Sequence, residues 1–222
     1  MDYLIAAFRL FVAFLALMGT KEIWLEGDLH GLVFFTNQTA LMLVVVMVWG
    51  ALAQVTQVPR PPAWFKGAVV VFLVITALVS FFVLEPESPD APVLVLGMTS
   101  GTIEHELNPL LAVLDFVLLD AHRRLRWWHA GAWLGYLVAY ATFTTIRAEI
   151  LPEPHYPYGF VDLGALGWGG FATNIAMYGA GFYVLGLLVV GLDRVLPARA
   201  LLGSGGSKGQ VGVGPATTSE GS

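Results

Sequence analysis

Hydrophobic residues along this 222-residue chain are gathered in six long runs, which short polar segments separate. A helix needs roughly 20 mostly apolar residues to cross about 30 Å of hydrocarbon, and each run is close to that length. The pattern therefore predicts an all-α, polytopic membrane protein built as a bundle of six transmembrane helices. The predicted spans are Tyr3–Gly19, a helix within Leu29–Pro59, Gly67–Leu84, Val93–Leu119, Trp127–Ile146 and a helix within Leu163–Leu192.

Composition strengthens this prediction and excludes several classes of protein. Hydrophobic residues make up 57% of the chain and charged residues 12%, whereas an average soluble domain has about 25% charged residues. The absence of cysteine excludes disulfides, thiolate nucleophiles, zinc–thiolate sites and iron–sulfur clusters. The 11 basic residues are scattered and form no nucleic-acid footprint.

The few charged residues predict the orientation, because short cytoplasmic loops are rich in Lys and Arg. The loops after the second and fourth spans and the C-terminal tail carry eight basic residues, and the alternate loops carry only two. Both termini are therefore expected to be cytoplasmic. The eight are Arg60, Lys66, Arg123, Arg124, Arg126, Arg194, Arg199 and Lys208, against Lys21 and Arg147.

The chain is expected to form one domain, residues 1–197, because no internal repeat is visible. Residues 198–222 are rich in Gly and Ser and lack apolar periodicity, which predicts a disordered cytoplasmic tail. The first run lacks a basic segment before Arg9, so we interpret it as a retained helix and not as a signal peptide.

The fourth predicted span is unusual because it contains Glu104, His105, Glu106 and Asp115. Ionisable residues inside a membrane are costly and usually face a bundle interior or a wet cavity, where they mark function. Two structural alternatives to a functional role remain open. In the first, these residues form a polar clamp between helices. In the second, the helix begins later in the chain, so that Glu104 lies among the lipid headgroups.

Residue spacing places His105 toward the bundle. Gly97, Gly101, His105 and Pro109 recur every four residues, so a helix would place them on one face. The two glycines would allow a close helix neighbour. Pro109 has no N–H for the His105 carbonyl, which predicts a kink at a plausible acid–base site.

The second predicted helix opens with the polar run Thr36–Thr39 (TNQT). In the structural alternative, its hydroxyls bond back to carbonyls of the preceding turn and its amides lie at the interface. The second and fourth spans run in the same direction, with Thr36 and His105 both in the outer half of the membrane. The two side chains can therefore meet if these helices are neighbours.

Three blocks of sequence resemble a known family. Phe35–Thr39 (FTNQT) resembles F-T-x-Q-S, and His105–Leu111 (HELNPLL) with Asp115-Phe116 resembles H-x-x-x-P-L-x-x-x-x-D-W. Tyr156–Asp162 (YPYGFVD) resembles Y-P-Y-P-F-L-D. Together, over about residues 1–197, they resemble the androgen-induced membrane hydrolase family and its six-helix bacterial relatives. The resemblance implies a multi-pass protein of the bacterial plasma membrane.

Members of that family studied in animals are threonine hydrolases that cleave fatty acid esters of hydroxy fatty acids. The resemblance implies Thr36 as the nucleophile and His105 as its base, with membrane lipids as substrates that enter between helices. No cofactor or metal is expected, since the H-E-x-x-H pattern that His105 begins ends in Pro109. Candidates for orienting the imidazole or binding the oxyanion are Asn37, Gln38, Glu104, Glu106, Asn108 and Asp115.

Two other functions remain open at this point. In an ion-coupled transporter, Glu104, Glu106, Asp115 and Arg147 would form the pathway. In a non-catalytic lipid-binding or scaffold protein, Thr36 would serve packing alone. A serine at position 36 should preserve hydrolysis where alanine abolishes it, whereas a scaffold should tolerate both.

Overall fold

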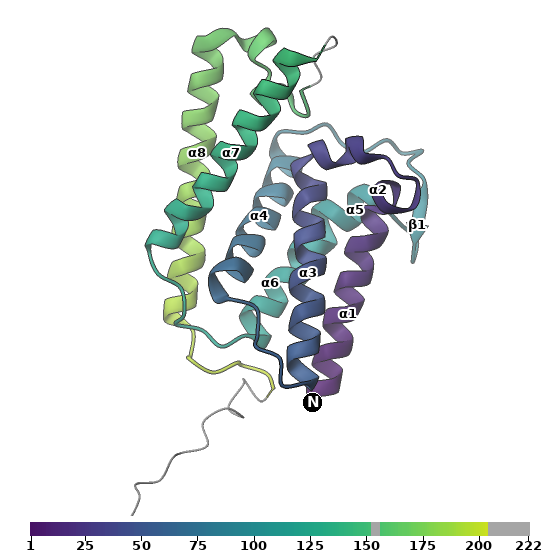
Figure 1. Cartoon of the computed structure of the whole chain (residues 1–222), viewed down its shortest axis with the longest axis vertical. Helices are drawn as coiled ribbons and strands as arrows, with labels where there is room; N and C mark the ends of the chain where they lie inside the picture. Colours follow the sequence, from purple (N-terminus) through teal and green to yellow (C-terminus); the bar gives the residue numbers. More distant parts are fainter. Residues whose placement is uncertain (152–155, 204–222) are drawn as a thin grey trace, which may run out of the picture.

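The computed structural model describes residues 1–151 and 156–203, and these residues are mostly helical (Figure 1). Most of the predicted disordered tail, residues 204–222, lies outside this range. The long helices are α1 (Asp2–Gly19), α3 (Phe35–Val55), α4 (Ala63–Phe82), α6 (Asn108–Leu119), α7 (Trp128–Ile150) and α8 (Leu163–Val195). The short elements are α2 (Lys21–Leu25), η1 (Leu29–Val33), β1 (Val93–Val95), β2 (Met98–Thr99), α5 (Ser100–Thr102), η2 (Ile103–Leu107) and η3 (Gly159–Val161).

Four helices in the described part of the chain, α1, α3, α4 and α8, are long and apolar enough to cross a membrane. This agrees with the predicted class of all-α membrane protein. The fourth and fifth predicted spans correspond to helical segments outside this group of four. Residues 100–119 are helical throughout but divide into α5, η2 and α6, and α7 is a single helix of 23 residues.

The helices form a bundle with α7 and α8 packed side by side along one flank (Figure 1). Two clusters of buried side chains hold it together. One lies among α1, α3 and α4 and includes Val12, Leu43 and Leu73. The other joins α4 to the α7–α8 pair and includes Phe72 and Trp133. The helix α4 contributes to both clusters and is therefore central to the packing.

The start of the fourth predicted span is not helical. Residues 93–99 form a two-stranded antiparallel hairpin in which Val95 pairs with Met98. The turn residues Leu96 and Gly97 have φ values of 50° and 79°, as a two-residue hairpin turn requires. The prediction that Gly97 shares a helix face with His105 is therefore wrong. The helix begins at Ser100.

The predicted disturbance at Pro109 takes the form of a π-helical turn, η2. The N–H of Asn108 donates to the carbonyl of Ile103, five residues earlier. Pro109 supplies no N–H to the carbonyl of His105, so the α-helical pattern cannot continue through this point. Such π turns widen the helix and are frequent at functional sites. The widened turn contains His105 itself.

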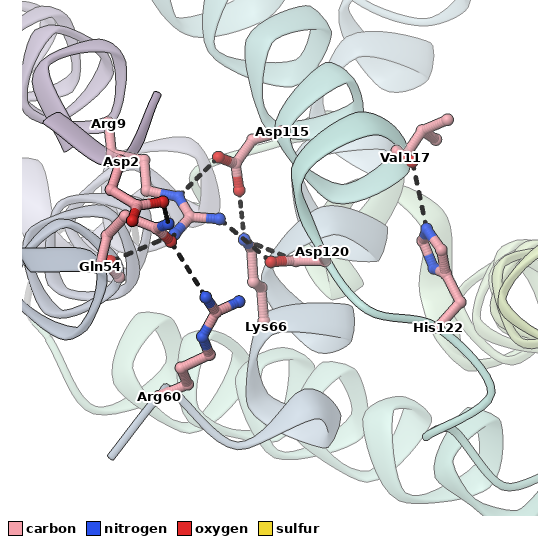
Figure 2. Close-up of polar contacts among 10 residues, drawn as sticks. Asp2, Arg9, Gln54, Arg60, Lys66, Asp115, Val117, Asp120 and His122 are labelled. Atoms are coloured by element: carbon pink, nitrogen blue, oxygen red, sulfur yellow. Dashed lines mark hydrogen bonds and ion pairs between the residues drawn. The ribbon is translucent and has the colours of Figure 1, made fainter. Parts of the chain in front are cut away.

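Four buried or partly buried charged side chains bind α1, α4 and the end of α6 together (Figure 2). Arg9 is only 2% exposed and donates through Nε to Oδ1 of Asp115 at 2.8 Å and through an η nitrogen to Asp120 at 3.1 Å. Lys66 contacts the other Asp115 oxygen and lies 2.6 Å from Asp120. We call these four residues the ionic cluster.

The ionic cluster extends to α3 through Arg9. Its guanidinium donates to the Gly50 carbonyl at 3.1 Å, and a Cβ at Gly50 would lie only 3.3 Å from the Arg9 side chain. Gln54 accepts a hydrogen bond from Arg60 at 3.1 Å and donates to Asp2 at 2.8 Å. Asp115 was also a candidate for orienting His105, but the contacts of both its carboxylate oxygens are with Arg9 and Lys66.

We predict that replacing Asp115 by alanine lowers the unfolding free energy by about 3–5 kcal/mol, because two buried cations would lose their shared counter-ion. Asp90→Ala, in an exposed loop, should change it by no more than about 0.5 kcal/mol. Unfolding of the purified protein in mixed detergent micelles measures both. Equal stability of the two variants would contradict a structural role for the ionic cluster.

Candidate functional site

The polar run at the start of α3 folds back on the segment before it. The Asn37 amide donates to the Gly31 carbonyl at 2.9 Å, and the Gln38 amide donates to the Leu32 carbonyl at 2.7 Å. Gln38 also accepts from the Tyr136 hydroxyl at 2.5 Å. These bonds fix η1 against the N-terminus of α3 and commit both amides to backbone carbonyls. Neither amide donates to the Thr36 hydroxyl, so the structure gives no support to their suggested oxyanion role.

Thr36 and His105, which are 69 residues apart, come together in the structure. The hydroxyl oxygen of Thr36 lies 3.5 Å from Nε2 of His105. Thr36 is the second residue of α3, and it is 7% exposed. The predicted alternative of back-bonded hydroxyls applies to its neighbour Thr39, which donates to the Thr36 carbonyl at 2.9 Å.

Tyr158 completes a three-residue contact that sequence reasoning missed. Its hydroxyl lies 3.4 Å from the Thr36 hydroxyl. The phenol therefore lies at the N-terminus of α3, where Phe34 provides no side-chain cap. Burial raises the pKa of this loop tyrosine above its ordinary value, so its hydroxyl remains a proton donor.

An acidic residue outside the predicted set lies near His105. Glu87, in the loop after α4, accepts hydrogen bonds from the Thr99 hydroxyl at 2.5 Å and the Gly101 N–H at 3.2 Å. Its carboxylate thereby caps the start of the helical run that carries His105.

The remaining predicted residues of this segment have different surroundings. Glu106 is exposed. Glu104 is buried against Gly19 at the end of α1. Among the described residues, one carboxylate oxygen of Glu104 and both amide atoms of the buried Asn108 have no hydrogen-bond partner. In the part of the chain that the structure describes, none of the three forms a hydrogen bond with the side chain of Thr36 or His105, so their suggested supporting roles remain predictions.

An apolar cavity of about 90 Å³ opens next to Thr36. It lies between the N-terminal end of α3, the C-terminal half of α4 and the α7–α8 pair, and Tyr158 and Phe160 from the loop before α8 close one side. Its polar wall groups are few. Among the residues that line it are Thr36, Thr76, Val79, Leu137, Tyr158, Ile175, Gly179 and Phe182.

The Thr36 hydroxyl therefore has an imidazole on one side and an apolar cavity on the other. This is the arrangement that acyl transfer from an apolar ester requires: an alcohol, a base within reach and room for a hydrocarbon chain. No family model, no curated protein and no solved structure matches this chain.

Proposed function

We propose that this protein is a multi-pass membrane hydrolase that cleaves long-chain lipid esters, with Thr36 as nucleophile and His105 as general base. The observation that carries the proposal is the position of the Thr36 hydroxyl between Nε2 of His105 and the apolar cavity. The resemblance of three sequence blocks to membrane threonine hydrolases supports the same assignment. This resemblance is a comparison of residues in this sequence with the motifs of that family.

The first chemical step forms an acyl-threonine. Nε2 of His105 takes the proton of the Thr36 hydroxyl as its oxygen attacks the ester carbonyl. The separation of 3.5 Å is longer than a productive hydrogen bond, and such contacts commonly shorten when substrate binds. The imidazolium then returns the proton to the departing alcohol as the ester C–O bond breaks.

The developing oxyanion lies at the N-terminus of α3 in this proposal. The N–H groups of the first turn of α3 have no partner within the helix, and the helix dipole favours negative charge at this end. Tyr158, whose hydroxyl lies 3.4 Å from that of Thr36, moves aside or donates its own proton to the oxyanion. Water deprotonated by His105 then attacks the acyl-threonine and releases the fatty acid.

The cavity suggests the substrate class. Its walls are almost entirely aliphatic and aromatic, so it suits an acyl chain and offers no charged partner for a polar headgroup. Fatty acid esters of hydroxy fatty acids, or similar acyl esters, fit this requirement. The cavity equally suits a non-catalytic lipid-binding protein, which variants at position 36 distinguish.

We further propose the complete topology of six spans with both termini in the cytoplasm. The continuous helical run of residues 100–119 serves as the fourth span, and α7 serves as the fifth. At 1.5 Å per residue, α7 is about 35 Å long and so matches the hydrocarbon thickness. The basic loops then lie on one side and the acidic loops on the other.

The catalytic assignment predicts that Thr36→Ala and His105→Ala each lower ester hydrolysis by roughly 10³-fold or more and abolish labelling by a fluorophosphonate probe. Thr36→Ser should keep activity, because it keeps the hydroxyl. Thr142→Ala removes an exposed hydroxyl on α7 and serves as the matched control. Full labelling of Thr36→Ala would refute the nucleophile assignment, and equal behaviour of the Ser and Ala variants would favour a lipid-binding protein.

The cavity predicts a change in chain-length preference when Gly179 is enlarged. Gly179 lines the cavity, so Gly179→Leu should fill part of it. Each methylene excluded costs about 0.8 kcal/mol, so kcat/KM should fall steeply for palmitoyl esters and little for butyryl esters. Gly181→Leu is the matched control, since nothing lies within 4 Å of a Cβ there. An unchanged chain-length profile in Gly179→Leu would argue that acyl chains bind elsewhere.

The natural absence of cysteine makes the topology directly testable. Single cysteines at Ser88 and Gly159 should react with a membrane-impermeant maleimide in intact cells. Cysteines at Arg126 and Arg199 should react only after permeabilisation. Labelling of Arg126→Cys in intact cells would show that residues 100–119 do not cross the membrane.

A further inference from the structure

A second cavity lies beside the ionic cluster, far from Thr36. Thr36 and Gly50, the residue of α3 that lines this cavity, are separated by about 21 Å along the helix, at 1.5 Å per residue. The cavity measures about 20 Å³, which is room for about one water or one oxygen of a larger group. It is lined by Arg9, Gly50, Arg60, Pro61, Ala63, Lys66, Phe116, Asp120, Ala121, Arg124 and Asp193.

The positive charges around this cavity are only partly neutralised. Arg9 and Lys66 share Asp115 and Asp120 in the ionic cluster. One carboxylate oxygen of Asp193 accepts from the backbone N–H groups of Arg124 and Leu125, at 2.9 and 2.8 Å, and the other lies 3.4 Å from Nδ1 of His122.

Two arginine side chains at the cavity remain without such a partner. Within residues 1–151 and 156–203, neither Arg60 nor Arg124 has a carboxylate within ion-pair distance. Arg60 donates to the neutral side chain of Gln54, and Figure 2 shows its guanidinium directed toward the cluster. Burial lowers the pKa of Arg60, as do the nearby charges of Arg9 and Arg124, whereas Asp120 and Asp2 act in the opposite direction. Four basic side chains and two carboxylates line the cavity, so positive charge is in excess there.

We propose that this cavity binds the phosphate of an anionic membrane lipid, with Arg60 and Arg124 as its two principal donors. Guanidinium groups are well matched to phosphate oxygens, to which they donate charge-assisted hydrogen bonds. One phosphate oxygen enters the cavity beside Lys66, and the rest of the group lies at the mouth against exposed Arg124. Ala63 begins α4 at the same wall, and a helix N-terminus favours an anion.

A lipid is the source of phosphate that the surroundings favour. The cavity is too small to enclose a whole phosphate, so most of the group must lie outside it, at the surface of the protein. Trp49 donates to the Pro59 carbonyl at 2.7 Å, and Trp64 is half exposed next to Ala63. Tryptophans concentrate at the level of the headgroups, which is where this phosphate would lie. The bound headgroup would join the loop before α4 to the loop after α6.

The test uses the full-length protein in nanodiscs of neutral phosphatidylcholine, with and without phosphatidylglycerol, and native mass spectrometry to count retained lipids. The wild-type protein should retain phosphatidylglycerol and gain thermal stability from it. Arg60→Gln and Arg124→Gln should each weaken that binding about tenfold, since each removes a charge-assisted hydrogen bond. Arg199→Gln, at an exposed arginine that does not line the cavity, is the matched control.

Two further measurements distinguish a lipid site from a misfolded variant and from a site for free phosphate. Arg124 is exposed, so Arg124→Gln should fold normally, and an unchanged melting temperature in neutral lipid checks this. Inorganic phosphate at matched ionic strength gives the second arm. Stabilisation by phosphatidylglycerol alone supports a lipid site, and stabilisation by both supports a phosphate site that soluble anions also fill. Equal retention of phosphatidylglycerol by wild type, Arg124→Gln and Arg199→Gln would overturn the proposal, as would no retention at all.

Discussion

The pairing of Arg9 with Asp115 is the interaction on which the rest of the helix arrangement depends. A charge buried in an apolar medium is costly unless an opposite charge or hydrogen bonds compensate it. Here, both members of the pair are almost completely buried. Neither α1 nor α6 can therefore place its charged residue without the other helix, and α4 joins them through Lys66. The Gly50 carbonyl on α3 accepts a further hydrogen bond from Arg9. One guanidinium on α1 therefore binds both α3 and α6.

This constraint carries over to the position of His105. Asp115 and His105 belong to one continuous helical run, so fixing Asp115 against α1 and α4 also restricts the face on which His105 can lie. The π turn at residues 103–107 adds a residue to one turn and so rotates the part before Pro109 relative to the part after it. The imidazole can thus face Thr36 on α3 while Asp115 faces Arg9 on α1.

The sequence pattern was sufficient for the helical class and for the approximate limits of the apolar segments, because hydrophobic length is a local property. It failed where a local signal was ambiguous. Residues 93–97 are mostly apolar and fit a helix, but Leu96 and Gly97 form a hairpin turn that only their backbone angles reveal. It also failed where partners were distant in the chain. Nothing in the sequence links Arg9 to Asp115, 106 residues away, or Tyr158 to Thr36, 122 residues away.

The two ends of the molecule solve the problem of polar groups in an apolar medium in different ways. At the ionic cluster, buried charges are neutralised by opposite charges, and each donor meets an oxygen. Around Thr36, the contacting groups are a hydroxyl, an imidazole and a phenol, all of which can be neutral. Permanent charges beside Thr36 would be costly without counter-ions, and counter-ions would occupy the space an ester needs. A site made of neutral groups can stay open to an apolar cavity and develop charge only when a proton moves. The fold keeps the permanent ion pairs at one end of α3 and the neutral groups at the other, so the charges that determine helix packing do not compete with the chemistry proposed for Thr36.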